Sequence, residues 1–230
     1  MRVDFHIHTK HSYDSFMKPR KVVEIARRRG LDGIAVTDHE TIMGGAEASK
    51  LAKETGIFVI IGCEVATEIG DVVGLFLEKE IESRRSEEVL KEIREQGGLS
   101  VLPHPLRGHK YPGGFPAMVD VIETHNSRSN RSQNQGAAEL AKQYRKPFVA
   151  GSDAHLYSEI GLSTTKIDCP DPRAIKGCLL SGKAEPERLG VASRNAANYS
   201  NLVKYMKKRQ YGKMPGGVVR AITGLRKRRD

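Results

Sequence analysis

Short apolar runs rich in β-branched residues alternate with helix-like segments through most of the chain. The runs predict strands at residues 2–6, 33–37, 58–63, 72–77, 99–102, 119–124 and 148–151. Helices are expected at residues 18–29, 46–55, 86–96, 134–144 and 171–180, and most of them end at a glycine or a proline-containing turn, as helix termination requires. This alternation is typical of parallel βα units and predicts a compact α/β barrel of seven strands, slightly short for eight such units.

Side chains that bind metals lie at the ends of these predicted strands. In the first strand Asp4, His6 and His8 alternate and are expected to share one face, so that the two imidazoles chelate an ion while Asp4 orients them from behind. The other strand ends carry the same types of side chain: Asp38, His39, Glu64, Asp71, His104, His125, Asn126, Asp153 and His155. Because the carboxyl ends of parallel strands converge on one surface, we expect a single cluster.

The composition of this cluster indicates the metal and the reaction. Histidine together with aspartate and glutamate, and without cysteine, suits zinc, manganese or iron rather than a closed structural zinc site. So many ligands predict two or three divalent ions, with Glu64 as the carboxylate that bridges two of them. Adjacent ions lower the pKa of a shared water and contact both the attacking and the leaving oxygen, so the expected reaction is hydrolysis by a metal-bound hydroxide.

Six motifs, taken in order, resemble those of the polymerase and histidinol phosphatase (PHP) family. They are D-x-H-x-H from Asp4, S-Y-D-S at 12–15, A-V-T-D-H at 35–39, G-C-E at 62–64, P-H-P at 103–105 and G-S-D-A-H at 151–155. The match spans roughly residues 1–190. The resemblance implies a distorted seven-stranded (β/α) barrel, a trinuclear metal site and hydrolysis of phosphoesters.

The resemblance also implies which residues bind the ions. The groups are His6, His8, Glu64 and Asp153 for a first ion, Glu64, Asp71 and His104 for a second, and Asp14, His39 and His155 for a third. Asp4 and Asp38 are expected to support these ligands without binding an ion themselves.

Two positions leave the ligand set open. Asp71 stands where many relatives of the family carry a histidine, and a carboxylate is a harder and shorter ligand, so the metal preference of that position is undecided. On the sixth predicted strand Glu123, His125 and Asn126 are all candidates, and His125 is the preferred ligand.

Two basic loops, after the fifth and sixth predicted strands, are expected to overhang the metals. Phosphate requires positive charge, and arginine can bind its oxygens with two hydrogen bonds. The predicted phosphate-binding residues are Arg107 and Lys110 in the first loop and Arg128 and Arg131 in the second. For any one of them, a solvated loop charge is an equally good explanation.

The excess positive charge lies in the last part of the chain. The net charge is +10, and residues 194–230 hold eleven of the 38 bases but only one of the 28 acids, so residues 1–193 hold 27 of each. We therefore predict a phosphoesterase barrel over 1–193 and a basic C-terminal helical extension over 194–230. The extension is either a docking helix with a solvated basic face or a contact for nucleic acid, with Tyr199, Tyr205 and Tyr211 as stacking platforms.

Cysteine usage and hydropathy bear on the compartment. Cys63, Cys169 and Cys178 are odd in number and form no C-x-x-C pair, which argues against a disulfide scaffold and favours a reducing environment. No apolar run approaches the roughly 18 residues that a membrane helix requires, and the N-terminus has no signal-peptide pattern. The expected location is the cytoplasm, and the oligomeric state is open.

The leading functional hypothesis is hydrolysis of a small phosphomonoester or a nucleotide. The nearest alternative is a nuclease that acts on RNA or DNA and holds the polymer with the basic extension. A metal-dependent amidohydrolase also begins with H-x-H, but Glu64 and the T-D-H segment fit that class poorly. A non-catalytic nucleic-acid-binding module is disfavoured, because unused buried carboxylates and imidazoles are costly to desolvate.

Overall fold

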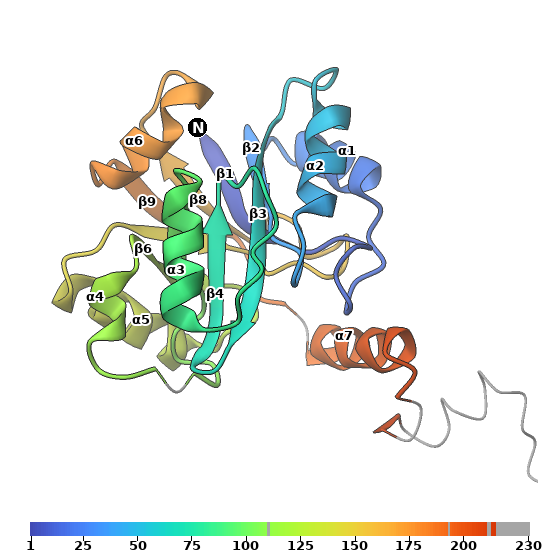
Figure 1. Ribbon diagram of the computed structural model, residues 1–230. Helices are drawn as coiled ribbons and strands as arrows, with labels where there is room; N and C mark the ends of the chain where they lie inside the picture. The colour runs from blue at the N-terminus through green and yellow to red at the C-terminus, as the bar shows by residue number, and fades with distance from the viewer. Residues whose placement is uncertain (110, 193, 211–212, 215–230) are drawn as a thin grey trace, which may run out of the picture.

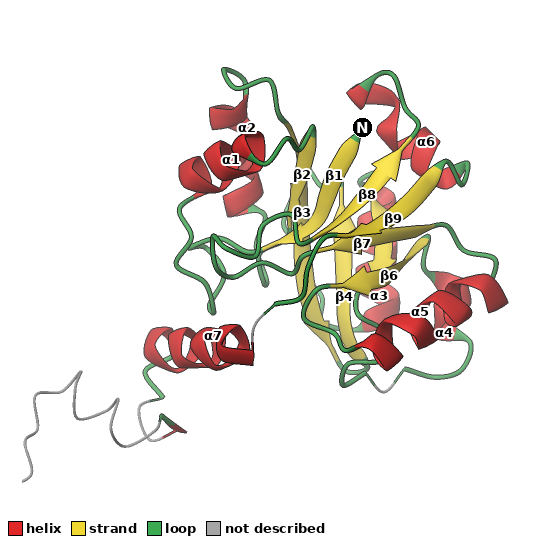
Figure 2. Ribbon diagram, turned by 180° about the vertical axis from the view of Figure 1, so that it is seen from behind, coloured by secondary structure: helices red, strands yellow, loops and turns green. Residues whose placement is uncertain are grey.

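The computed structural model describes residues 1–109, 111–192, 194–210 and 213–214, and these form a sheet of nine strands that curls into a nearly closed barrel (Figures 1 and 2). The strands are β1 (Arg2–Ile7), β2 (Gly33–Val36), β3 (Phe58–Thr67), β4 (Gly70–Leu75), β5 (Leu99–Leu102), β6 (Val121–Asn126), β7 (Phe148–Gly151), β8 (Ser163–Ile167) and β9 (Ala184–Arg188). Their order is β7-β6-β5-β4-β3-β2-β1-β8-β9. The sheet closes beside β1, where His8 N donates to Ala154 O (2.9 Å) and Ala154 N donates to His6 O (3.2 Å).

All seven predicted strands are present, with ends that differ by a few residues. The described residues also contain β8 and β9, so the prediction of seven strands is wrong by two. Both added strands pair antiparallel and lie beyond β1 at the edge of the sheet. Their sequences, STTKI and AEPER, are mostly polar, so they lack the hydrophobic pattern that marks the other strands.

The sheet is mixed rather than parallel throughout, because β4 runs antiparallel to both β3 and β5. A tight turn joins β3 to β4, with Val65 opposite Val72 and Ala66 opposite Asp71. The amino-terminal end of β4 therefore lies at the same edge of the sheet as the carboxyl ends of its neighbours. Because β4 runs in this direction, Asp71, near the start of β4, lies beside residues at the carboxyl ends of the neighbouring strands.

The helices are α1 (Pro19–Arg28), α2 (Met43–Ala52), α3 (Ser86–Glu95), α4 (Phe115–Met118), α5 (Arg131–Gln143), α6 (Ile175–Leu180) and α7 (Arg194–Lys207), with a 3-10 helix η1 (Pro172–Ala174). All the expected helices are present, and α4 is an addition. The first part of the predicted basic extension is α7, which lies at the opposite end of the sheet from α6 (Figures 1 and 2). Tyr211 and the terminal basic run lie outside the described residues.

Apolar side chains fix the strands that carry the strand-end residues. One buried cluster joins Val3 and Phe5 of β1 to Ala35, Val73 and Val149 on other strands. Another packs α1 and α2 against β1 and β2, and a further one packs α3 against β3, β4 and β5. Full burial of a large apolar side chain stabilises a fold by about 1.5–3 kcal/mol. This packing therefore holds the strand ends in fixed positions relative to one another.

Cys169 and Cys178 form a disulfide, with Cα atoms 5.8 Å apart, and Cys63 is buried and free. This corrects the expectation drawn from the cysteine count, because one bridge and one free thiol also give an odd number. The cytoplasmic location and the division of the chain at residue 193 remain predictions. In the described part of the chain, each helix is too short or too polar to cross a bilayer.

Candidate metal centre

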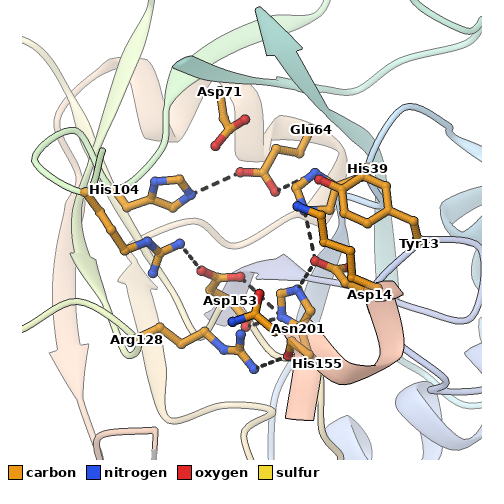
Figure 3. Close-up of a pocket in the computed structure, with 13 residues that line it drawn as sticks. Tyr13, Asp14, His39, Glu64, Asp71, His104, Arg128, Asp153, His155 and Asn201 are labelled. Carbon is orange, nitrogen blue, oxygen red and sulfur yellow. Dashed lines mark hydrogen bonds and ion pairs between the residues drawn. The ribbon is translucent and has the colours of Figure 1, made fainter. Parts of the chain in front are cut away.

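Glu64 of β3 lies between His104 and His39 in the middle of the predicted ligands (Figure 3). Its carboxylate is buried, and the residue is only 2% exposed. The Oε2 atom lies 3.3 Å from Nε2 of both His6 and His8 and 3.5 Å from Nδ1 of His39, whereas Oε1 lies 3.0 Å from Nε2 of His104. The two oxygens face different imidazoles, as a carboxylate that bridges two ions must.

A second carboxylate, Asp14, joins imidazoles from two other strand ends. Its Oδ2 atom lies 3.0 Å from Nε2 of His155 and 3.3 Å from Nε2 of His39 (Figure 3). Asp14 is in the loop after β1, whereas His39 follows β2 and His155 follows β7. His8 completes this group, because potential ligand atoms of all four residues lie within 4.8 Å of one another.

Asp153 lies beside both groups. Its Oδ1 atom is 3.3 Å from Nε2 of His8 and 3.9 Å from Nε2 of His6, while Oδ2 accepts hydrogen bonds from Arg107 and from Asn126 Nδ2 (3.3 Å). Asp153 and His104 have φ angles of 54° and 27°. Positive φ is costly for residues other than glycine, and such conformations are concentrated at functional sites.

Asp71, His104 and His109 form a further group whose ligand atoms lie within 4.8 Å of one another. The Nδ1 atom of His104 lies 3.1 Å from Nε2 of His109. The strand-end pattern identified Asp71 but not His109, which lies in the first of the two basic loops, between Arg107 and Lys110. The sequence feature that could have indicated it is its position, since His109 follows His104 by five residues in the same loop.

The chemistry of the cluster fits divalent ions. Among the described residues, both ring nitrogens of His8 and Nδ1 of His39 are buried without a hydrogen-bond partner. A buried polar atom without a partner carries an uncompensated desolvation cost. Imidazole nitrogen is a preferred ligand of zinc and iron, so ions held between these rings and the carboxylates would remove that cost.

The charges of the cluster are strongly coupled. Burial by itself raises the pKa of Glu64, but the neighbouring His39 and His6 outweigh it and hold that pKa well below its usual value. Burial lowers the pKa of His8, but the neighbouring Asp153 and Glu64 carboxylates, each 3.3 Å from its Nε2 atom, outweigh burial and raise the pKa to about 10. Glu64 is therefore ionised at neutral pH. Bound cations would compete with protons for the imidazoles.

Glu123 of β6 supports two of the ligands from behind. Its Oε1 atom lies 3.1 Å from Nδ1 of His6, which leaves Nε2 of that ring directed at Glu64. Its Oε2 atom accepts hydrogen bonds from His104 N (2.7 Å) and Asn126 Nδ2 (3.0 Å). A carboxylate behind a metal-binding imidazole fixes the tautomer and the orientation of the ring.

Asp4 and Asp38 support the backbone rather than the imidazoles. Asp4 accepts hydrogen bonds from the backbone N atoms of Ser152 (2.8 Å) and Gly161 (2.7 Å). Asp38 accepts hydrogen bonds from Thr9 Oγ1 (2.7 Å) and from the backbone N of Thr9. The pairing register of β1 shifts after Asp4, which interrupts the alternation expected along this strand.

The structure does not bring His125 into the cluster. Its Nδ1 atom lies 3.1 Å from Nδ2 of Asn134, and it belongs to none of the ligand groups found among the described residues. The pairing of β6 with β7 shifts between Glu123 and His125. Through this shift Glu123 and Asn126, instead of His125, reach the other ligands from the sixth strand.

A cavity of about 360 Å³ adjoins the ligands (Figure 3). The other residues of its wall are Tyr13, Arg107, Arg128, Ser200, Asn201 and Lys204. Two of the predicted phosphate-binding residues thus line the cavity. Arg131 is exposed at the start of α5 and is not part of the wall, and Lys110 lies outside the described residues. Three of the wall residues come from α7, which the sequence did not connect with the metal centre.

The chain belongs to the PHP domain family, whose model matches residues 4–215. An uncharacterized protein of Methanocaldococcus jannaschii is 32% identical over 233 residues, which cover 93% of this chain and 91% of that relative. A second uncharacterized protein of the same organism is 44% identical over 116 residues, or 46% of this chain and 68% of that relative. Family membership makes the protein a metal-dependent hydrolase that acts on phosphoesters.

The fold has also been seen in a solved structure of low sequence similarity. A two-domain protein from Bacteroides vulgatus, described as containing a predicted PHP-like metal-dependent phosphoesterase, superposes with a TM-score of 0.72. The superposition covers 88% of this chain and 69% of that chain, at 18% identity. The likeness supports the nearly closed barrel found here.

Proposed function

We propose that this protein hydrolyses a small phosphomonoester or a nucleotide at a centre of two or three divalent ions. The observation that carries the proposal is the position of Glu64, whose two oxygens face separate sets of imidazoles beside a cavity of about 360 Å³. Cavities of this size accommodate small molecules, and cationic residues in the wall suit a phosphate group. Zinc, manganese and iron all fit the donor set.

The proposed ligands are those expected from the sequence, except that His125 is left out and His109 is added. The groups are His6, His8, Glu64 and Asp153; Glu64, Asp71 and His104, with His109 beside them; and Asp14, His39 and His155, with His8 beside them. When bound, the ions supply the positive charge that polarises the phosphoryl group and activates water. From the sixth strand, Glu123 acts through His6 and does not bind an ion itself.

Other residues keep the ligands in place during the reaction. Arg107 forms an ion pair with Asp153 and donates a hydrogen bond to Asn126 Oδ1 (3.0 Å), so it fixes the carboxylate on the side away from the imidazoles. Tyr13 stacks on His39, with ring centroids 4.4 Å apart and an interplanar angle of 9°. These contacts limit the rotation of two ligands that face the cavity.

One observation favours the nuclease alternative. A second hollow is lined by Tyr199, Tyr205 and Lys213 and shares Asn201 with the metal-centre cavity. Tyr199 is 37% exposed. An aromatic side chain next to a cationic one provides a stacking position for a base that neighbours the scissile phosphate.

A panel of phosphate esters tests the proposal and separates these alternatives. Protein loaded with zinc, manganese or iron is incubated with small phosphomonoesters, phosphodiesters and short oligonucleotides, and released phosphate and cleaved strands are measured. We expect release of phosphate from small monoesters. Cleavage confined to oligonucleotides and weakened by Tyr199→Ala would favour the nuclease, and no cleavage of any ester with any metal would contradict the proposed function.

A further inference from the structure

The two arginines of the cavity are already engaged with buried carboxylates. Arg107 contacts Asp153 through one terminal nitrogen and Asn126 through the other. Arg128 donates to both oxygens of Glu159, from Nε at 3.2 Å and from Nη2 at 3.0 Å. Asp153 and Glu159 are each only 2% exposed. Much of the positive charge of both guanidinium groups is therefore neutralised, and releasing either one would leave a buried carboxylate without its partner.

Lys204 of α7 is a cavity cation of a different kind. Among the described residues it has no carboxylate within ion-pair distance, and its recorded contact is with the ring of Tyr13, whose centroid lies 5.0 Å from Nζ. That ring stacks on His39, one of the proposed ligands. The ammonium group therefore stands next to the metal centre with its three donors available to a ligand.

The position of α7 over the cavity is fixed by contacts at two points along the helix. Near its end, Lys207 Nζ donates to the carbonyl oxygens of Lys10 (2.7 Å), Ser12 (2.6 Å) and Ser15 (2.6 Å), in the loop that carries Asp14. Nearer its start, Ser200 Oγ accepts a hydrogen bond from Arg128 Nη2 (2.9 Å). All three donors of the Lys207 ammonium are used, so this side chain holds the helix against the loop.

The spacing along α7 then determines which side chains face the cavity. Asn201 and Lys204 are three residues apart and so lie on one face of the helix, and both line the cavity. Lys208, four residues after Lys204, also approaches the ring of Tyr13, at 3.9 Å from its centroid, but it is exposed and is not part of the wall.

We propose that Lys204 is the phosphate-binding cation of this active site, while Arg107 and Arg128 hold the site together. Its ligand is a phosphate group, carried by the substrate or released as inorganic phosphate. The inference rests on the proposed function for the chemical identity of this anion. It differs from the sequence prediction, which gave this role to the two loops and treated the extension as a separate part.

The test measures the binding of inorganic phosphate to the metal-loaded full-length protein by titration calorimetry, which needs no turnover. Lys204→Gln removes a charge-assisted contact and is expected to weaken phosphate binding by about tenfold or more. Lys208→Gln, which removes the neighbouring charge over the same ring, is the matched control and should change the affinity by less than about twofold. Lys204→Arg should recover part of the affinity.

Metal content and thermal unfolding of each variant are measured alongside. The inference is overturned if Lys204→Gln binds phosphate as the wild type does, or if Lys208→Gln loses as much affinity. If Lys204→Gln folds poorly, Lys204→Arg decides, because this variant keeps the charge and should bind phosphate. A folded arginine variant that binds no phosphate would contradict the proposal. Phosphate binding that depends on Lys204 in a protein that cleaves no ester would uphold this inference and contradict the proposed function.

Discussion

The two sides of the metal centre differ in how the fold holds them. One, the inner side, consists of His6, His8, Asp14, His39, Asp153 and His155, at the ends of β1, β2 and β7. The other, the Asp71 side, consists of Asp71, His104 and His109, from β4 and the loop after β5. Glu64 connects the two.

The comparison relates the direction of each strand to the burial of the residues at its end. His6, His8 and Asp153 follow or end parallel strands and are almost fully buried. Asp71 and His109 are partly exposed, because one lies at the start of an antiparallel strand and the other in a loop. We infer that the inner side supplies the ions on which activity depends, and that the Asp71 side adjusts metal preference.

The largest effect should come from His8→Ala on the inner side. The substitution removes an imidazole that lies close to both Glu64 and Asp153 and leaves these buried carboxylates uncompensated. Substitution of a residue that supports a metal ligand from behind already lowers activity or metal affinity by about 10–100-fold. Loss of the ligand itself should therefore lower kcat by more than about 100-fold and reduce the amount of bound metal. Steady-state kinetics and elemental analysis measure both. Retention of full metal content and activity would remove His8 from the site.

The next effect should come from Glu123→Gln, with His125→Ala on the same strand as its control. Glutamine cannot hold His6 with a negative charge, so we expect activity or metal affinity to fall by about 10–100-fold. Nδ1 of His125 lies 3.1 Å from Asn134 Nδ2, and His125 belongs to none of the ligand groups found among the described residues. Its alanine variant should therefore keep activity within about twofold. The reverse ranking would restore His125 as the ligand from the sixth strand.

On the Asp71 side a smaller effect is expected. Asp71→Ala removes a proposed ligand that is partly exposed, where water can take its place, so activity should fall by about tenfold, less than for His8→Ala. Asp71→His places an imidazole at the same position and should retain activity with a changed order of preference among zinc, manganese and iron. A loss for Asp71→Ala as large as that for His8→Ala would show that the two sides are equivalent.

Much of the residue cluster of the candidate metal centre could be predicted from the sequence, because its members lie at strand ends. His8, His39, Glu64 and His104 each follow or end an apolar run, and a barrel brings such ends together. The same argument placed His125 in the cluster, whereas it belongs to none of the ligand groups found among the described residues. The pairing of β6 with β7 shifts beside it, and such a shift is a local backbone event that no sequence periodicity predicts. The polar strands β8 and β9 were missed for want of a hydrophobic pattern.

The contribution of α7 lay beyond any local pattern. Lys207 is 192 residues after Ser15 in the sequence, yet its ammonium group contacts that residue's carbonyl oxygen. A basic helix read in isolation resembles a solvated or nucleic-acid-binding segment. Only the packing of α7 on the loop after β1 shows that Lys204 belongs to the cavity.

The contrast between the two sides should also appear in the pH dependence of the metal-free protein. The folded-state pKa of His8 is raised to about 10, so its contribution to stability is fully present below about pH 6.5 and is lost as pH rises toward 10. Burial, with His104 nearby, lowers the pKa of His109 to about 4, so its contribution is present above about 6.5 and is lost as pH falls toward 4.

Urea unfolding of the metal-free protein between pH 4 and 10 measures this difference. The stability lost in His8→Gln should be largest at low pH and should shrink as pH rises, whereas the stability lost in His109→Gln should shrink as pH falls. Equal and pH-independent losses in the two variants would contradict the electrostatic contrast between the sides.

The most direct measurement of the central claim is metal stoichiometry together with phosphate release, for the wild type and for Glu64→Gln. If Glu64 bridges ions of the two sides, the loaded wild type holds two or three divalent ions per chain and cleaves a phosphoester. The amide of glutamine is a neutral and weaker ligand, so the variant should lose at least one ion together with most of the activity. A wild type that binds one ion or none, or a variant that keeps all its ions and its activity, would contradict a metal centre built around Glu64.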